Sequence, residues 1–142
     1  MMNIPDFSTL RPDAALADVS EWPVAHIRFP ELDEPDRVGR VLGALDALLA
    51  QRQPFAVIWS MASHDHDDEP HEDEKRATIW IRQRKGDLRA FCKGYVYVAP
   101  TQELHDLLAG RFRTVQKLYG FPLLLADDRE DARRQAQALL AA

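Results

Sequence analysis

The chain has 142 residues and a formal net charge of −5, from 18 basic and 23 acidic side chains. This length fits one domain with a real core, and the acidic balance disfavours a general role in nucleic-acid binding. No apolar run approaches the roughly 20 residues of a membrane span, and the first residues lack the basic and apolar regions of a signal peptide, so we expect a cytoplasmic protein without membrane insertion.

The first half of the chain predicts two strands separated by a long helix. Residues 1–20 are mixed in composition and are expected to form an arm or an edge element. Residues 22–30 are expected to form a half-buried or edge strand. Asp33 can cap the helix that follows, and Pro54 comes after its end. The apolar positions of this helix recur at helical spacing: Val38, Val41, Leu42, Leu45, Leu48 and Leu49. The apolar run 54–61 then predicts a buried strand.

A basic helix is predicted from Lys75 to Lys93, and Gly94 is expected to end it as a left-handed cap. One face of this helix collects its less polar positions: Ala77, Trp80, Ile81, Arg84, Leu88, Phe91 and Cys92. A short strand over residues 95–99 follows, since this segment is rich in β-forming residues.

The last third of the chain predicts a helix, a strand and a final helix. Thr101 is the expected N-cap of the first helix, and Gly120 is expected to close it. The apolar stripe between them is Leu104, Leu107, Leu108, Phe112, Val115 and Leu118. Residues 121–126 predict a strand, and Asp127 with Asp128 caps the last helix.

Strands and helices therefore alternate along the chain. This alternation predicts an α/β fold with a mostly parallel sheet of four to five strands and flanking helices, joined by right-handed crossovers. No internal repeat, low-complexity tail or linker divides the sequence, so residues 21–142 are expected to form a single domain after the arm.

An acidic segment with three histidines, residues 64–74, follows the buried strand. In a parallel sheet it would leave the carboxyl end of a central strand, where open α/β folds usually place their sites. Imidazole and carboxylate groups suit Zn, Ni, Cu or Mn, which makes His64, His66 and His71 candidate metal ligands. Their spacing matches no known ligand motif. We therefore favour a solvated loop whose acids assist the following helix start, with only adventitious binding of a divalent metal.

The predicted basic helix offers a second candidate surface. Arg82, Arg84 and Arg89 could hold a phosphate group or an acidic partner, although ion pairs on a solvated face are the favoured alternative. Tyr97 shares a strand face with Tyr95 and could line a pocket, with core packing as the alternative. We expect Cys92 to be a buried small hydrophobe, and His26 and His105 to be structural or solvated. As the only cysteine, Cys92 also excludes a disulfide framework or a CxxC metal site.

Two features resemble a known family: the strand Pro54-Phe55-Ala56-Val57-Ile58 after a long helix, and the ending Tyr119 to Ala132. With the order of elements, they resemble the STAS/SEC14-type domains, and within them the SpoIIAA-like group related to anti-sigma-factor antagonists. In those antagonists a serine in an Asp-Ser-x-Gly-like turn after the central strand is phosphorylated. Ser60 and Ser63 occupy that neighbourhood, but the aspartate and the glycine are missing, so we expect no phosphoswitch.

The resemblance implies a bacterial, non-enzymatic regulatory module that acts through a protein partner, as a monomer or a homo-oligomer. No GxGxxG, Walker, GxSxG or HExxH motif gives a positive reason to propose an enzyme, and no cofactor is predicted. One alternative is a domain that binds a small ligand or lipid, and a third is a metal-dependent enzyme using the His/Asp segment. The aromatic candidates for lining a ligand site are Trp59, Trp80, Phe91, Tyr95, Phe112 and Phe121.

Overall fold

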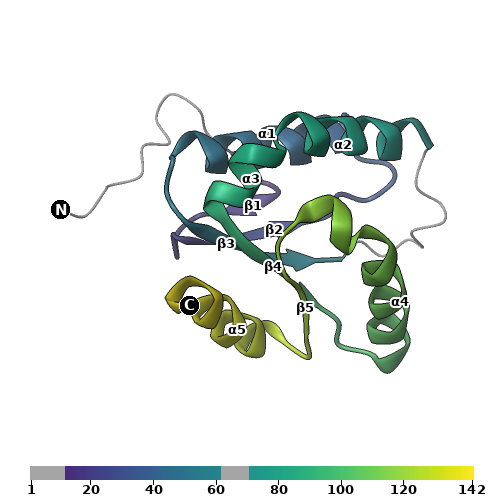
Figure 1. Ribbon diagram of the computed structural model, residues 1–142. Coiled ribbons are helices and arrows are strands. Elements are labelled where there is room, and N and C mark those ends of the chain that lie inside the picture. The colour runs from purple at the N-terminus through teal and green to yellow at the C-terminus, as the bar shows by residue number, and fades with distance from the viewer. Residues whose placement is uncertain (1–11, 62–70) are drawn as a thin grey trace.

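The computed structural model describes residues 12–61 and 71–142 of the chain, and these contain one mostly parallel sheet (Figure 1). Its strands lie in the order of the sequence: β1 (Ala17–Asp18), β2 (Val24–Arg28), β3 (Phe55–Ser60), β4 (Cys92–Val98) and β5 (Leu123–Ala126). β1 pairs with β2 in antiparallel orientation, and the other three pairs are parallel. The predicted α/β class and mostly parallel sheet are thus confirmed.

The described residues form five helices where four were predicted. They are α1 (Arg37–Ala50), α2 (His71–Gln83), α3 (Lys85–Phe91), α4 (Gln102–Tyr119) and α5 (Arg129–Ala141). The extra helix arises because Arg84 leaves helical geometry between α2 and α3, with φ −111° and ψ 16°. The Arg84 guanidinium is bonded to Asp46 of α1 and stacks over the Trp80 ring, 4.7 Å from its centre.

Two predicted helix starts are corrected. α2 begins at His71 rather than at Lys75, so residues 71–74 are helical and not part of a loop. Their carboxylates lie in the first turn, where they stabilise the positive end of the helix dipole. α1 begins after Asp36, not at a cap on Asp33, and Asp36 makes no side-chain cap bond. The predicted N-caps of α4 and α5 are confirmed, since Thr101 accepts from the Leu104 amide at 3.2 Å and Asp128 from the Asp131 amide at 2.8 Å.

The two faces of the sheet are covered unequally. α1, α2 and α3 lie together on one side and α5 lies on the other (Figure 1). α4 packs in the same core cluster as the first three helices, through Leu108, and shares Trp59 and Tyr97 of the sheet with them. The α5 face has a smaller cluster in which Ala132 and Ala136 are fully buried against the strands. Large side chains therefore concentrate on the four-helix face.

Gly94 lies inside β4 and is not the predicted helix cap. Its φ of 154° is unusual for any other residue, and the pairing of β3 with β4 shifts register beside it, between Phe55 and Val57. A Cβ atom at this position would lie 2.8 Å from Leu139 Cδ1 and 2.9 Å from the Pro122 carbonyl oxygen. That oxygen cannot easily move, because it accepts the Tyr95 amide at 3.0 Å. Glycine is required here by both conformation and space.

We expect Gly94→Ala to lower the free energy of unfolding by about 1–3 kcal/mol, because it combines a strained backbone with a contact against fixed backbone. The matched control is Gly110→Ala in α4, where a Cβ atom meets nothing within 4 Å. This control should gain up to about 1 kcal/mol through helix propensity alone. Urea unfolding followed by circular dichroism measures both, and equal stability of the two variants would contradict the assignment.

Candidate functional site

A cavity of about 440 Å³ lies at the carboxyl ends of the central strands. Phe29 and Met61, the residues directly after β2 and β3, contribute to its wall, as does Tyr97 near the end of β4. Pro30 of the β2–α1 connection and residues of α1, α2 and α4 supply the rest of the lining. The cavity is thus bounded by the sheet and by helices on the four-helix face.

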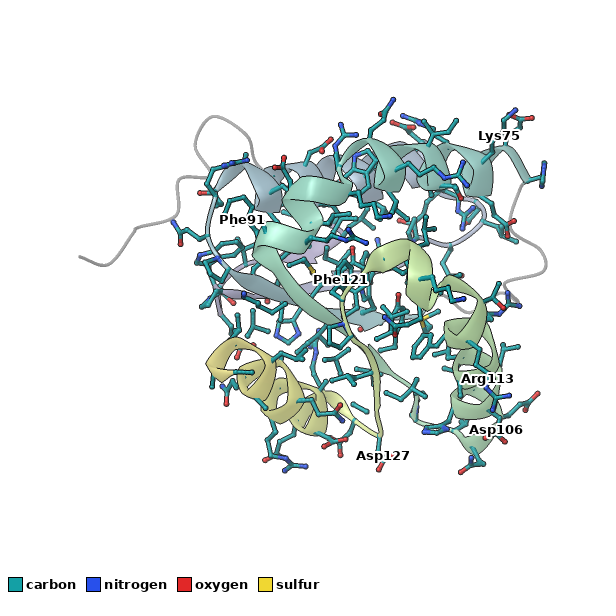
Figure 2. All side chains as sticks on the ribbon, in the orientation of Figure 1. Lys75, Phe91, Asp106, Arg113, Phe121 and Asp127 are labelled. Carbon is teal, nitrogen blue, oxygen red and sulfur yellow. The ribbon has the colours of Figure 1, made fainter. Side chains whose placement is uncertain are left out.

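Most of the wall is apolar, and α4 contributes the largest share. Its lining residues are Leu104, Leu107, Leu108, Arg111, Phe112, Thr114, Val115 and Tyr119. Only Leu108 among the residues of α4 is buried, and Leu107 keeps 41% of its surface exposed. The polar side of the helix points outward, as the labelled Asp106 and Arg113 show (Figure 2). The predicted apolar stripe of α4 therefore faces the cavity as well as the core.

Stacked aromatic rings support the sheet side of the cavity. Phe29 stacks on Trp59 with 4.6 Å between ring centres, and Trp59 stacks on Tyr97 at 6.3 Å. Tyr97 also contacts Phe112 of α4 at 5.0 Å. Because Trp59 is only 2% exposed and lies between two of these rings, the floor of the cavity is held in one arrangement by close packing.

Arg37 at the start of α1 joins three segments beside the cavity. Its Nε donates to the Glu31 carbonyl at 2.8 Å and its Nη2 donates to the Pro30 carbonyl at 3.1 Å. Its Nη1 lies 3.5 Å from Asp73 Oδ2 in the first turn of α2. Arg37, Pro30 and Asp73 all line the cavity, so this contact fixes the β2–α1 connection against α2.

Glu34 also orders the connection between β2 and α1, through hydrogen bonds to Arg28 and Glu31. Its carboxylate accepts hydrogen bonds from both Nη atoms of Arg28 at 2.8 Å and from the Glu31 amide at 2.6 Å. Arg40 of α1 is 3.4 Å away and also binds Asp13 at 2.7 Å. The bonds from Arg28, followed by the Glu31 amide, lower the pKa of Glu34 from 4.5 to about 2.

Two tyrosines are the phenolic groups of the cavity wall. Tyr97 is 7% exposed, and Tyr119 in α4 is half-buried. Burial raises the pKa of Tyr97 well above its ordinary value, and it raises the pKa of Tyr119 to about 12. Both phenols are therefore protonated and able to donate a hydrogen bond at neutral pH.

Of the predicted partner-binding and metal-binding residues that the structure describes, Tyr97 alone lines this cavity. Ser60 ends β3, where its carbonyl accepts the Phe29 amide at 2.9 Å. Arg82 and Arg89 are exposed on α2 and α3, and Arg84 is engaged with Asp46. Each of these four residues lies outside the cavity wall as the described residues define it.

Of the three predicted metal ligands, the structure describes His71 alone. Ser63, His64 and His66 lie outside the described residues. His71 is exposed in the first turn of α2. Residues 12–61 and 71–142 contain no group of three or more side chains arranged to hold a metal ion.

Of the aromatic residues proposed for a ligand site, Phe112 lines the cavity. Trp80 instead lines an open groove between α1 and α2, and Tyr95 and Phe121 are buried core residues. Sequence reasoning did not single out Met61 or Arg111, which do line the cavity. The sequence did carry one indication of the cavity: the apolar face of α4 is wider than a helix needs for packing against the core alone.

His26 and Cys92 are buried away from the cavity. His26 Nε2 lies 2.7 Å from Glu21 Oε1, and Glu21 also binds Arg133 of α5. Burial, then the nearby Arg129 charge, lowers the pKa of His26, and Glu21 opposes this effect. Cys92 is 3% exposed, and burial raises its pKa to about 12. Both residues have structural positions.

We expect the stability of the protein to depend on Glu34 between about pH 4.5 and 2. The unfolded chain binds a proton on this carboxyl at a higher pH than the folded chain does, because the folded pKa is about 2. The Glu34 contribution is therefore complete above pH 4.5 and is lost as the pH falls through this window. Urea unfolding at a series of pH values measures it.

Glu34→Gln should be less stable than the wild type at pH 6, and the difference should shrink as the pH falls towards 2. Glu103→Gln, at an exposed position in the first turn of α4, is the control. A stability difference for Glu34→Gln that stays constant over this range would contradict the proposed network.

No helix in the described parts of the chain is long and apolar enough to cross a membrane. Comparison with known proteins finds no matching family model, no matching curated protein and no matching solved structure.

Proposed function

We propose that this chain is a binding domain for a small, largely apolar molecule, held in the cavity between α1, α2, α4 and the sheet. The observation that carries the proposal is the cavity itself, about 440 Å³ in volume and mostly apolar in its wall. Ligand sites in proteins commonly have volumes of about 300–1,000 Å³ and combine apolar walls with a few polar groups.

The energetics of α4 support the proposal. Leu104, Leu107 and Val115 line the cavity without being buried by the protein. Removing apolar surface from water contributes about 25 cal/mol per Å², so a ligand that covers these side chains gains from surface that the fold leaves accessible. The rigid aromatic floor adds to this, because a preformed site loses little conformational freedom on binding.

The location also supports binding. The cavity lies at the carboxyl ends of β2, β3 and β4, the ends of the strands at which open α/β folds hold their ligands, although here it lies between helices of one face because the strand order does not reverse. The residues that shape it are fixed by the Arg37 and Glu34 contacts, which order the β2–α1 connection. A bound molecule would thus meet a wall built from several rigid elements.

The STAS-like topology and the regulatory module that it implies stay predictions, as do a protein partner, a homo-oligomer and a cytoplasmic location. Ligand binding was the alternative raised by the sequence, and the cavity makes it the better supported of these hypotheses. The proposal assigns no reaction to the site.

The proposal is tested with 2-isopropylnaphthalene as an apolar probe. Ala77 of α2 lines the cavity, so the indole in Ala77→Trp would occupy the space that the probe needs. We expect the wild type to bind the probe and Ala77→Trp to bind it about tenfold more weakly or not at all. Equilibrium dialysis, read by naphthalene fluorescence, measures the affinity.

Ala90→Trp is the matched control, because Ala90 is exposed on α3 and lies outside the cavity wall. It should bind the probe as the wild type does. Native mass spectrometry of freshly purified protein would in addition detect a molecule that has been retained from the cell. If the wild type fails to bind the probe, or if both tryptophan variants bind it equally, the cavity is not a ligand site.

A further inference from the structure

Tyr97 is the polar side chain on the floor of the cavity. It lies near the carboxyl end of β4, is 7% exposed and contributes to the cavity wall. Its ring is held between Trp59, at 6.3 Å, and Phe112, at 5.0 Å. Because these neighbours are themselves packed in the core cluster, the phenol has a fixed position at the base of the site.

The Tyr97 hydroxyl makes no hydrogen bond to any group of residues 12–61 and 71–142. This oxygen is not one of the fully buried polar atoms that lack a partner, so it reaches the accessible space of the cavity wall, where a polar group usually bonds to protein or solvent. A phenol in this state offers one donated hydrogen bond to a molecule in the cavity. The aromatic rings of Trp59 and Phe112 beside it limit its contact with bulk water.

Among the described residues, Arg37 and Arg111 are the cations of the cavity wall, and both already interact with other groups. The Arg37 guanidinium already binds two backbone carbonyls and approaches Asp73. Asp73 and Glu74 of α2 add negative charge to the wall. A carboxylate placed against Tyr97 would lose its hydration among aromatic rings, which is strongly unfavourable for an unpaired charge.

We propose that the ligand is an uncharged molecule with an apolar body and one hydrogen-bond acceptor, a carbonyl or ether oxygen, which accepts the Tyr97 hydroxyl. This inference rests on the proposed function and adds the chemical class of the ligand. It makes Tyr97 the residue that selects such a molecule over a hydrocarbon of the same shape.

The test compares three naphthalene probes of similar size. 2-Acetylnaphthalene carries a carbonyl acceptor, 2-isopropylnaphthalene replaces it with carbon, and 2-naphthoate replaces it with a charged carboxylate. Affinities are measured by equilibrium dialysis for the wild type, Tyr97→Phe, Tyr119→Phe and Tyr95→Phe. Tyr95 is the matched control, because it lies two residues earlier on the same face of β4 but outside the cavity wall.

We expect the wild type and Tyr95→Phe to bind the ketone roughly 3- to 10-fold more tightly than the hydrocarbon, the usual gain from one hydrogen bond. Tyr97→Phe should bind both probes with equal affinity, and its affinity for the hydrocarbon should match that of the wild type. The naphthoate should bind more weakly than the ketone. A thermal unfolding curve for each variant confirms that the loss is specific to the hydroxyl.

Other outcomes separate the two proposals. If the hydrocarbon binds but the ketone gains nothing, or if Tyr97→Phe keeps the preference, the cavity is a ligand site and the assigned ligand class is wrong. Tighter binding of the naphthoate overturns the uncharged class in the same way. Loss of the preference in Tyr119→Phe but not in Tyr97→Phe transfers the role to Tyr119 and overturns the assignment. If neither neutral probe binds the wild type, the proposed function fails, and the inference fails with it.

Discussion

The strand order of the sheet is the constraint on which the rest of this structure depends. From β2 to β5, each strand lies directly beside the strand that precedes it in the sequence, always on the same side. Connections between parallel strands are almost always right-handed. Successive crossovers in one direction must then place their helices on the same face. α1 to α4 accordingly share one core cluster, and α5, which follows the last strand, covers the other face. Doubly wound folds reverse their strand order and gain a crevice at that point, whereas here the cavity forms between helices.

This unequal covering determines which side chains each face needs. The single helix α5 approaches the strands closely, so its fully buried contact positions are alanines, and Gly94 leaves room for Leu139. The opposite face must fill a wider space beneath four helices, and it does so with Trp59, Tyr95 and Tyr97. The space that these rings leave between α1, α2 and α4 is the cavity. Its position thus follows from topology, and its shape follows from the aromatic floor and the contacts of Arg37.

Much of the fold could be predicted from the sequence because its signals are local. The capping residues Thr101 and Asp128 act within one helical turn, and the apolar spacing of α4 is visible in the chain itself. The break at Arg84 and the role of Gly94 could not be predicted, because each depends on a partner distant in sequence, Asp46 and Pro122 respectively. Tyr97 could be proposed as a pocket residue from the sequence, because it shares one face of its strand with Tyr95. The remainder of the cavity wall required the helix arrangement, which no local pattern encodes.

The burial of Cys92 has a practical consequence for studies of this protein. Thiol reagents attack the thiolate, and a side chain that is 3% exposed, with a pKa of about 12, has almost no thiolate at neutral pH. Cys92 is also the only cysteine of the chain. A cysteine introduced at an exposed position such as Ala90 would therefore accept a maleimide dye or spin label selectively, with Cys92 left in place. Distances to the helices around the cavity could then be followed in the otherwise native protein.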